Sequence, residues 1–149
     1  MDEVIRIFNR HRVRYLLIGG QAVRLEGLPR FTMDWDFYVP ARDTANFDRI
    51  NRLLADELDE PVLPLGPRGE NFVQTYQTRW GVIQFHLGSV GLPNFDDVEK
   101  RAVVHVSKNG ARARCISLKD LIASKKRAGR PQDLLDVEFL ERKLRADSR

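Results

Sequence analysis

The sequence is poor in cysteine and has no long hydrophobic run, and both shortages exclude classes of protein. Its one cysteine, Cys115, has no second cysteine for an internal disulfide and no companion at metal-ligand spacing, so thiol and zinc chemistry lack support. No apolar run approaches the roughly 18 residues that a membrane-spanning helix needs, and the first residues are charged, unlike a signal peptide. We therefore expect a cytoplasmic protein without a membrane partner, in which Cys115 is a small core residue on a strand.

What is present is the composition of an ordinary globular protein. The 149 residues are 42% hydrophobic and 31% charged, which predicts a single domain over residues 1–149. Charge is distributed unevenly, because residues 1–100 hold 12 Lys and Arg against 15 Asp and Glu, whereas residues 101–149 hold 13 against 6. This asymmetry indicates either an anionic partner for the C-terminal part or basic residues that decorate solvated helices.

Hydrophobic periodicity and turn residues predict an α/β (α+β) fold, in which helices pack on a mixed β-sheet and two helices end the chain. Helices are expected at residues 2–12, after Gly20, at 42–58, and in two C-terminal segments at about 117–128 and 131–143. Strands are expected at 13–18 and 31–40, as two runs within 71–88, and in a hairpin that turns at Asn109-Gly110. Residues 61–70 are rich in proline and glycine, which predicts a loop.

The segment FTMDWDFYVP, residues 31–40, alternates like a strand and places two carboxylates on one side. Side chains two apart on a strand point the same way, about 6 to 7 Å apart, so Asp34 and Asp36 should project together. Four apolar side chains are expected to face the core from the opposite side: Met33, Trp35, Phe37 and Val39. Like charges so close are destabilising unless they are solvated, paired or bridged by a cation, and Mg²⁺ accepts one or two carboxylates together with phosphate oxygens. The pair indicates either a metal site or an exposed strand face that keeps an edge soluble.

Gly19 and Gly20 fall between a predicted strand and a predicted helix. Without side chains there, a phosphate group can approach backbone N–H groups at the positive end of the helix dipole. A tight turn that needs a positive φ explains the same pair. A phosphate signal this close in sequence to a divalent-metal signal is what a metal-bound nucleoside triphosphate would satisfy.

Lys125 continues the apolar stripe of a predicted helix. Leu118, Leu121 and Ile122 define the stripe at helical spacing, and Lys125 is its next position. Such a lysine either extends outward at the end of the stripe or points at an anionic partner, because an unpaired buried ammonium is costly.

Two acids on the following helix are candidate partners for this lysine. Asp133 and Asp136 lie three residues apart, and either could pair with Lys125 or with Arg130. The alternative is that acids near a helix start are simply favoured by the dipole, which fits Asp133 better than Asp136.

Together, LLIGGQAVRLEGLPRFTMDWDFYV and SLKDLIASKKRAGRPQDLLDVEFL resemble the minimal nucleotidyltransferase-fold proteins of the polymerase-beta-like superfamily. The likeness is to a bacterial and archaeal branch that contains stand-alone uncharacterised members and the toxins of abortive-infection-type toxin–antitoxin systems. These proteins carry a glycine pair that opens a helix, a D-x-D on the following strand and a late K-x-x-x-x-R-x-x-D-x-x-D segment. Four residues stand at the positions of that late segment: Lys125, Arg130, Asp133 and Asp136. The resemblance covers about residues 14–140, although residues 55–110 contribute no motif.

The resemblance implies transfer of a nucleoside monophosphate from an NTP to a hydroxyl of RNA, protein or a small molecule, with release of pyrophosphate. It implies that Asp34 and Asp36 hold Mg²⁺ or Mn²⁺ and act in catalysis with Lys125. It implies nucleotide contacts from five positions: Gly19, Gly20, Gln21, Lys125 and Arg130. Asp133 and Asp136 would support the site. A cognate antitoxin is a further partner that the toxin members imply.

One departure separates this sequence from catalytic members of the family. They generally supply a third carboxylate from a neighbouring strand, whereas the matching stretch here, WGVIQFHLG, offers Gln84 and His86. Gln84 can lend a carbonyl oxygen to Mg²⁺ but no charge, and His86 could act as a base or as a hydrogen-bonding group behind the metal ligands. Gln21 also stands where many members have a small hydroxyl residue. The alternative function is therefore a non-catalytic nucleotide- or RNA-binding member of the same fold.

Overall fold

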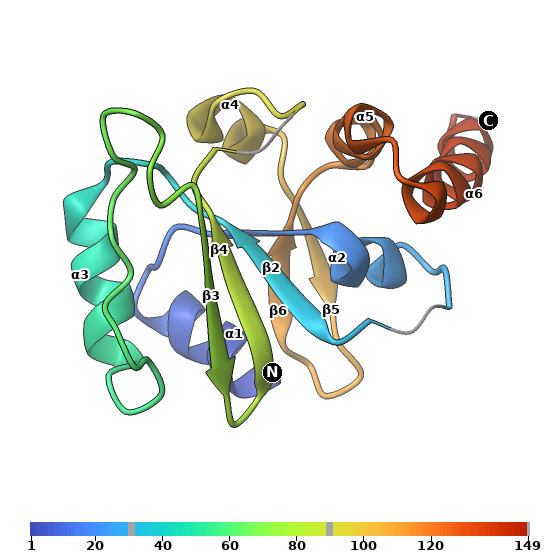
Figure 1. Ribbon diagram of the computed structural model, residues 1–149. Helices are drawn as coiled ribbons and strands as arrows, with labels where there is room; N and C mark the ends of the chain where they lie inside the picture. The colour runs from blue at the N-terminus through green and yellow to red at the C-terminus, as the bar shows by residue number, and fades with distance from the viewer. Residues whose placement is uncertain (30–31, 89–90, 149) are drawn as a thin grey trace.

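A computed structural model describes residues 1–29, 32–88 and 91–148, and in it one mixed sheet is flanked by helices (Figure 1). The described strands are β1 (Leu16–Ile18), β2 (Asp34–Tyr38), β3 (Val73–Thr78), β4 (Gly81–His86), β5 (Val103–Val106) and β6 (Arg112–Cys115). The described helices are α1 (Asp2–Arg10), α2 (Gly19–Leu25), α3 (Thr44–Leu53), α4 (Phe95–Lys100), α5 (Leu118–Ala128) and α6 (Pro131–Asp147). The predicted mixed sheet with two C-terminal helices is confirmed. Among the described helices, none is both long and apolar enough to cross a membrane.

The carboxylate-bearing strand β2 lies inside the sheet, whose order is β3-β4-β2-β1-β6-β5. It runs antiparallel to β1 and parallel to β4. Asp36 stands opposite Ile18, the last residue of β1, on one side and opposite Gln84 on the other. Because paired residues share a face of a sheet, this register brings the start of α2, Asp36 and Gln84 together.

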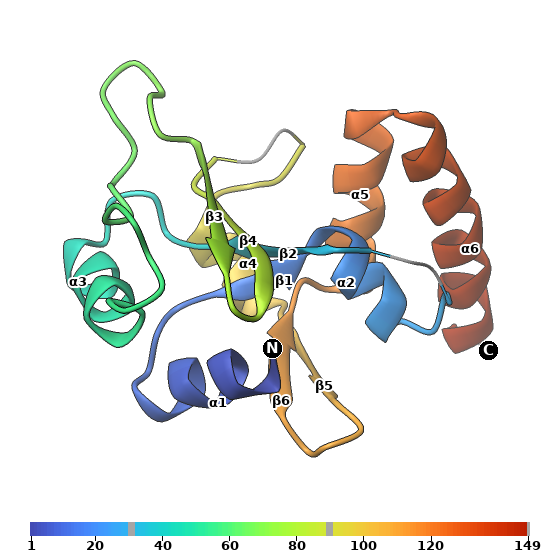
Figure 2. The ribbon, with the colours of Figure 1, turned by 60° about the horizontal axis from the view of Figure 1, so that its bottom comes forward.

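Caps that are readable in the sequence fix the ends of the two C-terminal helices. The Ser117 side chain accepts a hydrogen bond from the Asp120 N–H and begins α5, and Gly129 ends this helix with a φ of +66°. Pro131 opens α6 directly afterwards. The residue Gly129 in the left-handed region and the proline behind it force the chain to reverse, so α5 and α6 pack side by side (Figures 1 and 2).

The core forms two clusters of buried side chains. One cluster joins α1 and α3 to the sheet and contains packed rings of Phe8, Phe37 and Phe85. The other joins residues of β1 and β2 to α2, α4, α5 and α6. Cys115 is 1% exposed on β6, as predicted, and burial raises the pKa of its thiol to about 12, so it is inert at neutral pH.

The prediction that Met33 faces the core is wrong. Its side chain is 67% exposed, whereas Phe37 and Val39 are fully buried and Trp35 is partly buried against the core. The reason is that β1 ends opposite Asp36 and so does not reach Met33, while the β4 residue at the next position of the register is Gly81, which has no side chain to cover it. Phe31, where the predicted strand began, lies outside the described residues.

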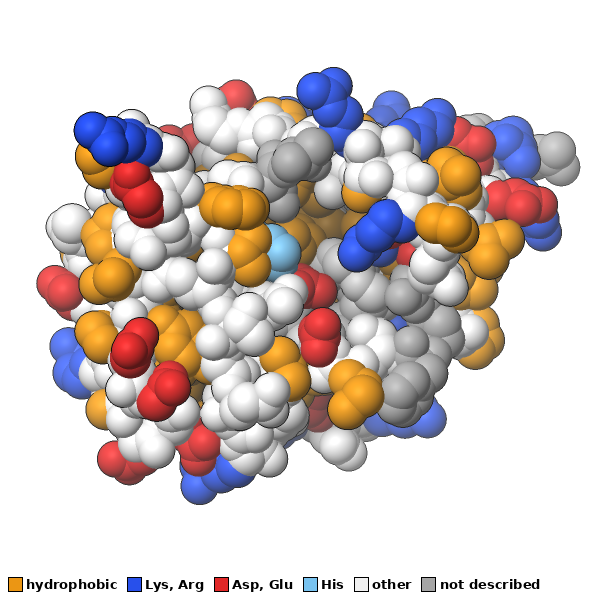
Figure 3. Space-filling view, viewed as in Figure 1, with side chains coloured by type: hydrophobic (Ala, Val, Ile, Leu, Met, Phe, Trp, Pro, Cys, Tyr) orange, Lys and Arg blue, Asp and Glu red, His pale blue; other side chains and the backbone are white. Residues whose placement is uncertain are grey.

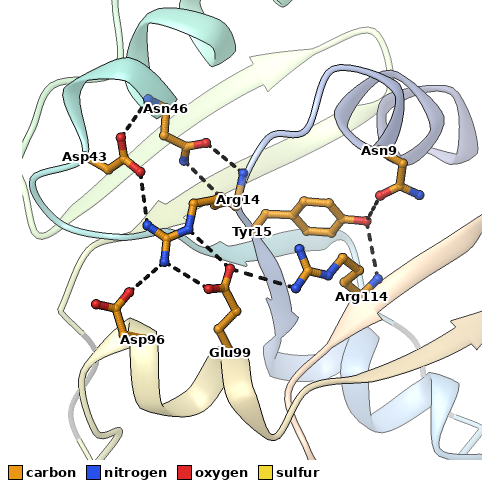
Figure 4. Close-up of polar contacts among 8 residues, drawn as sticks. All are labelled: Asn9, Arg14, Tyr15, Asp43, Asn46, Asp96, Glu99 and Arg114. Atoms are coloured by element: carbon orange, nitrogen blue, oxygen red, sulfur yellow. Dashed lines mark hydrogen bonds and ion pairs between the residues drawn. The ribbon is translucent and has the colours of Figure 1, made fainter.

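Arg14 joins three parts of the fold just before β1 (Figure 4). Its guanidinium donates to Asp43 at 3.1 Å, to Asp96 at 2.6 Å and to Glu99 at 2.9 Å, and lies over the ring of Phe95. The hydrogen bond that Arg14 donates to Glu99 is the largest cause that raises the pKa of Arg14. The cluster fixes the starts of α3 and α4 against β1, on whose other end the glycine pair lies.

Glu26, just after α2, is buried between His105 and Lys143. Its carboxylate accepts from His105 of β5 at 2.9 Å and from Lys143 of α6 at 2.7 Å. The hydrogen bond with His105, ahead of the pair with Lys143, lowers the pKa of Glu26 below its ordinary 4.5 although burial opposes this.

We expect Glu26→Gln to lower the free energy of unfolding by about 2 kcal/mol at pH 7, because Lys143 loses its charged partner and His105 loses a charged hydrogen-bond acceptor. The folded-state pKa of Glu26 lies below the unfolded value, so its contribution is complete above about pH 4.5 and is lost as the pH falls through the folded-state pKa. Urea unfolding from pH 7 to pH 3 should therefore show the two proteins converging in acid. A difference that stays constant over this range would contradict the assignment.

Candidate functional site

A cleft of about 480 Å³ opens between the sheet and the two C-terminal helices. Its lining comes from β1–α2, β2, β4, α5 and the start of α6, and includes Gly19, Gly20, Asp34, Asp36, Gln84, His86, Lys125, Arg130 and Asp133. Figure 3 shows this hollow, with histidine and carboxylate side chains beside the C-terminal helices. Residues more than 100 positions apart in the sequence therefore meet in one place.

Asp36 is hydrogen-bonded to a histidine of the neighbouring strand. Its carboxylate lies 2.8 Å from His86 Nε2, and both side chains are mostly buried, at 15% and 18% exposure. Asp34, two residues earlier on β2, lines the same cleft, as the strand alternation predicted. Because His86 holds one oxygen of Asp36, the strand presents this carboxylate in a fixed orientation.

Gly19 adopts the left-handed region, with a φ of +68°, where the chain passes from β1 into α2. A Cβ built on Gly19 would lie 2.4 Å from Asp36 Oδ2, far inside contact distance. Both the backbone angle and the close approach of Asp36 therefore require glycine. The need for glycine at position 19 therefore has two causes, the positive φ of the turn and the closeness of the Asp36 carboxylate.

We expect Gly19→Ala to destabilise the fold and to displace the Asp36 carboxylate. The matched control is Gly129→Ala, because Gly129 has nearly the same φ, +66°, yet a Cβ there would meet nothing closer than 3.7 Å. The control should cost about 1 to 2 kcal/mol for the backbone angle alone, and Gly19→Ala should cost more. Urea unfolding of both variants checks this, and equal losses would show that the contact with Asp36 is unimportant.

Two helices begin at the cleft. The first turn of α2 contributes Gly19 and Gly20, and the first turn of α6 contributes Pro131, Gln132 and Asp133. The first N–H groups of a helix have no partner within it and lie at the positive end of its dipole. At α6, however, Pro131 has no N–H and the Asp133 carboxylate caps the Arg130 N–H, so the N-terminus without a side-chain cap is that of α2, beside the carboxylates of β2.

Lys125 is 6% exposed and is held by two aspartates. Its Nζ lies 3.2 Å from Asp133 Oδ1 and 3.1 Å from Asp136 Oδ2, and these acids are 1% and 0% exposed. Burial alone would raise the pKa of Asp133, but hydrogen bonds from Arg130 and then Lys125 outweigh it and hold this pKa below its usual value. Of the alternatives left open by the sequence, the structure therefore has Lys125 paired with anionic partners.

Arg130 is the exposed cation of the cleft, with 75% of its side chain accessible to solvent. Its Nε donates to Asp133 at 2.7 Å. That hydrogen bond is the main cause that raises the pKa of Arg130, and the charge of Asp36 across the cleft adds to it. Arg130 therefore faces the carboxylates of β2 from the α5–α6 turn.

The β4 positions match the sequence expectation. Gln84 stands opposite Asp36 and lines the cleft, and His86 lies two residues farther along the same strand. Among the described residues, no group of three or more His, Cys, Asp or Glu side chains could hold a metal ion. The protein therefore offers two carboxylates and one amide oxygen, with His86 behind them.

The fold has clear relatives among solved structures. The Thermotoga maritima protein TM1012, provisionally assigned as a nucleotidyltransferase, superposes with a TM-score of 0.68 over 97% of this chain and 89% of its own, at 13% identity. The lincosamide antibiotic adenylyltransferase LnuA, solved with lincomycin bound, gives a TM-score of 0.63 over 93% and 92%, at 19% identity. The chain has the nucleotidyltransferase fold.

A third structure with this fold, the antibiotic-resistance factor ANT(2'')-Ia, gives a TM-score of 0.53 over 97% of this chain and 89% of its own, at 12% identity. No protein-family model matches the sequence, and no curated protein matches it. The chain thus shares the nucleotidyltransferase fold with these structures at low sequence identity.

Within this nucleotidyltransferase fold, Gln21 is set apart from the other predicted site residues. It is 3% exposed on α2, its side chain accepts from Arg24, and it is not among the described residues that line the cleft. Asp136 is likewise behind the lining, where it also accepts from Gln132. Sequence reasoning missed Ser124 and Gln132, which do line the cleft. Their positions next to Lys125 and at the start of α6 were the available signals.

Proposed function

We propose that this chain is a Mg²⁺-dependent nucleotidyltransferase, which moves a nucleoside monophosphate from an NTP to a hydroxyl and releases pyrophosphate. One observation carries the proposal: a single cleft holds the paired carboxylates of Asp34 and Asp36 together with the N-terminus of α2 and Arg130. Carboxylates suit a divalent cation, and helix N-termini suit phosphate. A metal–triphosphate complex has the charge distribution that matches both.

The donor set fits a metal that arrives with its nucleotide. Mg²⁺ is commonly bound by one or two carboxylates, with the remaining positions filled by water and substrate phosphates. Asp34 and Asp36 would supply the carboxylates, and the Gln84 amide oxygen would be a neutral third donor. Bound Mg²⁺ or Mn²⁺ would neutralise phosphate charge and align the attacking hydroxyl.

The other cleft residues would bind the triphosphate. The free N–H groups of the first turn of α2, at Gly19, Gly20 and the backbone of Gln21, would receive phosphate oxygens. Arg130 would turn from Asp133 to phosphate with little rearrangement, because its side chain is exposed. Lys125 has three N–H donors, of which the aspartates occupy two, so the third remains for a phosphate oxygen.

His86 would serve mainly to orient Asp36. Its Nε2 is already engaged with the Asp36 carboxylate, which is the geometry of a group that fixes a ligand. A role for His86 itself as the base stays a prediction.

The acceptor would be a hydroxyl of RNA, protein or a small molecule. Two structures with this fold are named for their action on antibiotics or for antibiotic resistance. Among the three acceptor classes, this supports a small molecule, without indicating which one. A cognate antitoxin and a cytoplasmic location likewise stay predictions from the sequence.

The proposal is tested by label transfer. The full chain is incubated with each α-labelled NTP, with Mg²⁺ or Mn²⁺, and in turn with total RNA, cell protein and small-molecule extract. We expect label transfer with one acceptor class and pyrophosphate release in step with it. Mn²⁺ titrated by electron paramagnetic resonance should bind much more tightly with a non-hydrolysable NTP than without it. Absence of both nucleotide binding and label transfer would reject the proposal.

A second candidate is a non-catalytic nucleotide- or RNA-binding protein of the same fold. Gln84 favours this candidate. It stands opposite Asp36, at the position where catalytic members of the family that the sequence resembles generally have an acid. Nucleotide binding without turnover, together with turnover gained in Gln84→Asp, would select this candidate.

A further inference from the structure

The edge strand β5 has an exposed apolar surface. It pairs with β6 alone and ends the sheet opposite β3. Val103, Val104 and Val106 are 37%, 46% and 57% exposed. Edge strands of this kind usually carry a charge, a proline or a bulge that blocks pairing with another chain, and the sequence VVHV has no proline and no Lys or Glu.

The register shows which backbone groups of β5 are free. The Ser107 N–H donates to the Ala111 carbonyl at 2.8 Å, so alternation along the antiparallel pair makes His105 the next residue bonded to β6. The backbone groups of Val104 and Val106 then point away from β6, toward the outer edge.

Two contacts on the other side of β6 agree with this alternation, and Figure 4 shows the one between Arg114 and Tyr15. The Arg112 carbonyl accepts from Asn9, and the Arg114 N–H donates to the Tyr15 hydroxyl, so the backbone of these partners of Val106 and Val104 turns away from β5. Within the described part of the chain, no hydrogen bond reaches the outward groups of Val104 and Val106.

A basic groove of about 400 Å³ adjoins this edge. It lies between the end of α1 and the hairpin, and Arg12, Arg112, Arg114 and Val104 line it with Asn9 and Val13. Arg114 has only a distant ion pair, at 3.8 Å with Glu99, and the side chains of Arg12 and Arg112 have no ion pair among the described residues. Residues 100–116 contain five Lys and Arg and no Asp or Glu.

These features distinguish among the occupants of the edge. A second copy paired through β5 would bring two clusters of arginines together, which like charge disfavours. Single-stranded nucleic acid would need stacking side chains, and the groove lining contains no aromatic residue in the described part. An extended peptide with acidic and apolar side chains satisfies the free backbone groups, the valines and the arginines at once.

We propose that β5 and the adjoining groove bind an extended acidic segment of a partner protein, which adds to the sheet as a seventh strand beside β5. Backbone hydrogen bonds to Val104 and Val106 supply the pairing, and Arg12, Arg112 and Arg114 select acidic side chains. This inference does not depend on the nucleotidyl-transfer proposal, because the edge lies apart from the cleft residues.

The test uses a labelled eight-residue peptide of alternating glutamate and valine, titrated into the full chain by fluorescence anisotropy. We expect saturable binding that the same peptide with lysine for glutamate does not show. Arg12→Glu with Arg112→Glu should weaken binding about tenfold or more, while Arg68→Glu, in the 61–70 loop, should leave it unchanged. Val104→Pro should also weaken binding without unfolding the hairpin, because the Val104 N–H does not bond to β6.

Amide exchange decides the binding mode. Bound peptide should slow exchange at the N–H groups of Val104 and Val106, and His105 should change little because it is already bonded to β6. Failure of the acidic peptide to bind, or binding without protection of Val104 and Val106, would overturn the proposal. So would tighter binding of a poly-dT octamer than of the peptide, or a stable dimer in sedimentation that already protects these amides.

Discussion

Asp36→Ala is expected to lower the rate of nucleotidyl transfer by about a thousandfold or more while leaving the protein folded. Asp36 is the metal-ligand candidate whose orientation the structure fixes, between His86 and the turn at Gly19. If it binds the divalent cation, its loss removes several kcal/mol of charge stabilisation, and each 1.36 kcal/mol corresponds to about tenfold in rate. The label-transfer assay with the identified acceptor measures this effect, and circular dichroism reports the fold.

Two further variants sharpen this test. Asp36→Asn keeps the shape of the side chain and a hydrogen-bond acceptor for His86 but removes the charge, so it should be nearly as inactive as alanine if the charge is what matters. Asp97→Asn removes an exposed carboxylate of α4 outside the cleft and should keep full activity. Transfer at the wild-type rate in both Asp36 variants would exclude Asp36 from the reaction.

Lys125→Met is expected to lower the free energy of unfolding by about 3 to 5 kcal/mol. Methionine keeps most of the volume of the side chain but leaves Asp133 and Asp136, which are 1% and 0% exposed, without their shared cation. Breaking a buried ion pair from one side costs this much because a charge is left in a site from which water is excluded. Urea unfolding at pH 7 measures the loss.

Lys126→Met is the matched control, one residue along α5. Lys126 pairs with Glu141 at 2.6 Å, but the two side chains are 56% and 37% exposed, so its loss should cost less than about 1 kcal/mol. Adding Asp136→Asn to Lys125→Met should restore part of the lost stability, since one of the two buried carboxylates that shared Lys125 is then neutral. Equal, small losses for Lys125→Met and Lys126→Met would show that the buried cluster is not a stabilising one.

Sequence patterns predicted correctly those features that depend on a single helix or strand. The alternation of residues 34–38 placed Asp34 and Asp36 on one side of a strand, and the Ser117, Gly129 and Pro131 signals placed the two C-terminal helices. It failed at Met33, because burial at the end of a strand depends on what the neighbouring strands offer there: β1 stops opposite Asp36, and β4 offers only Gly81. Gln21 shows a similar limit: its helix was predicted, but which side of the helix faces the cleft depends on packing.

The sequence by itself determined the elements and the kinds of chemistry they carry: the glycine turn, the paired carboxylates, the cation on an apolar stripe and the missing third acid at Gln84. Only the tertiary structure decided that Lys125 forms ion pairs with Asp133 and Asp136, that Arg130 and Asp36 line the same cleft, and that β5 is an edge strand of the sheet. The physical reason is range. Turns, caps and strand alternation arise from neighbouring residues, whereas ion pairs and exposed edges depend on which distant segments the packed sheet brings together.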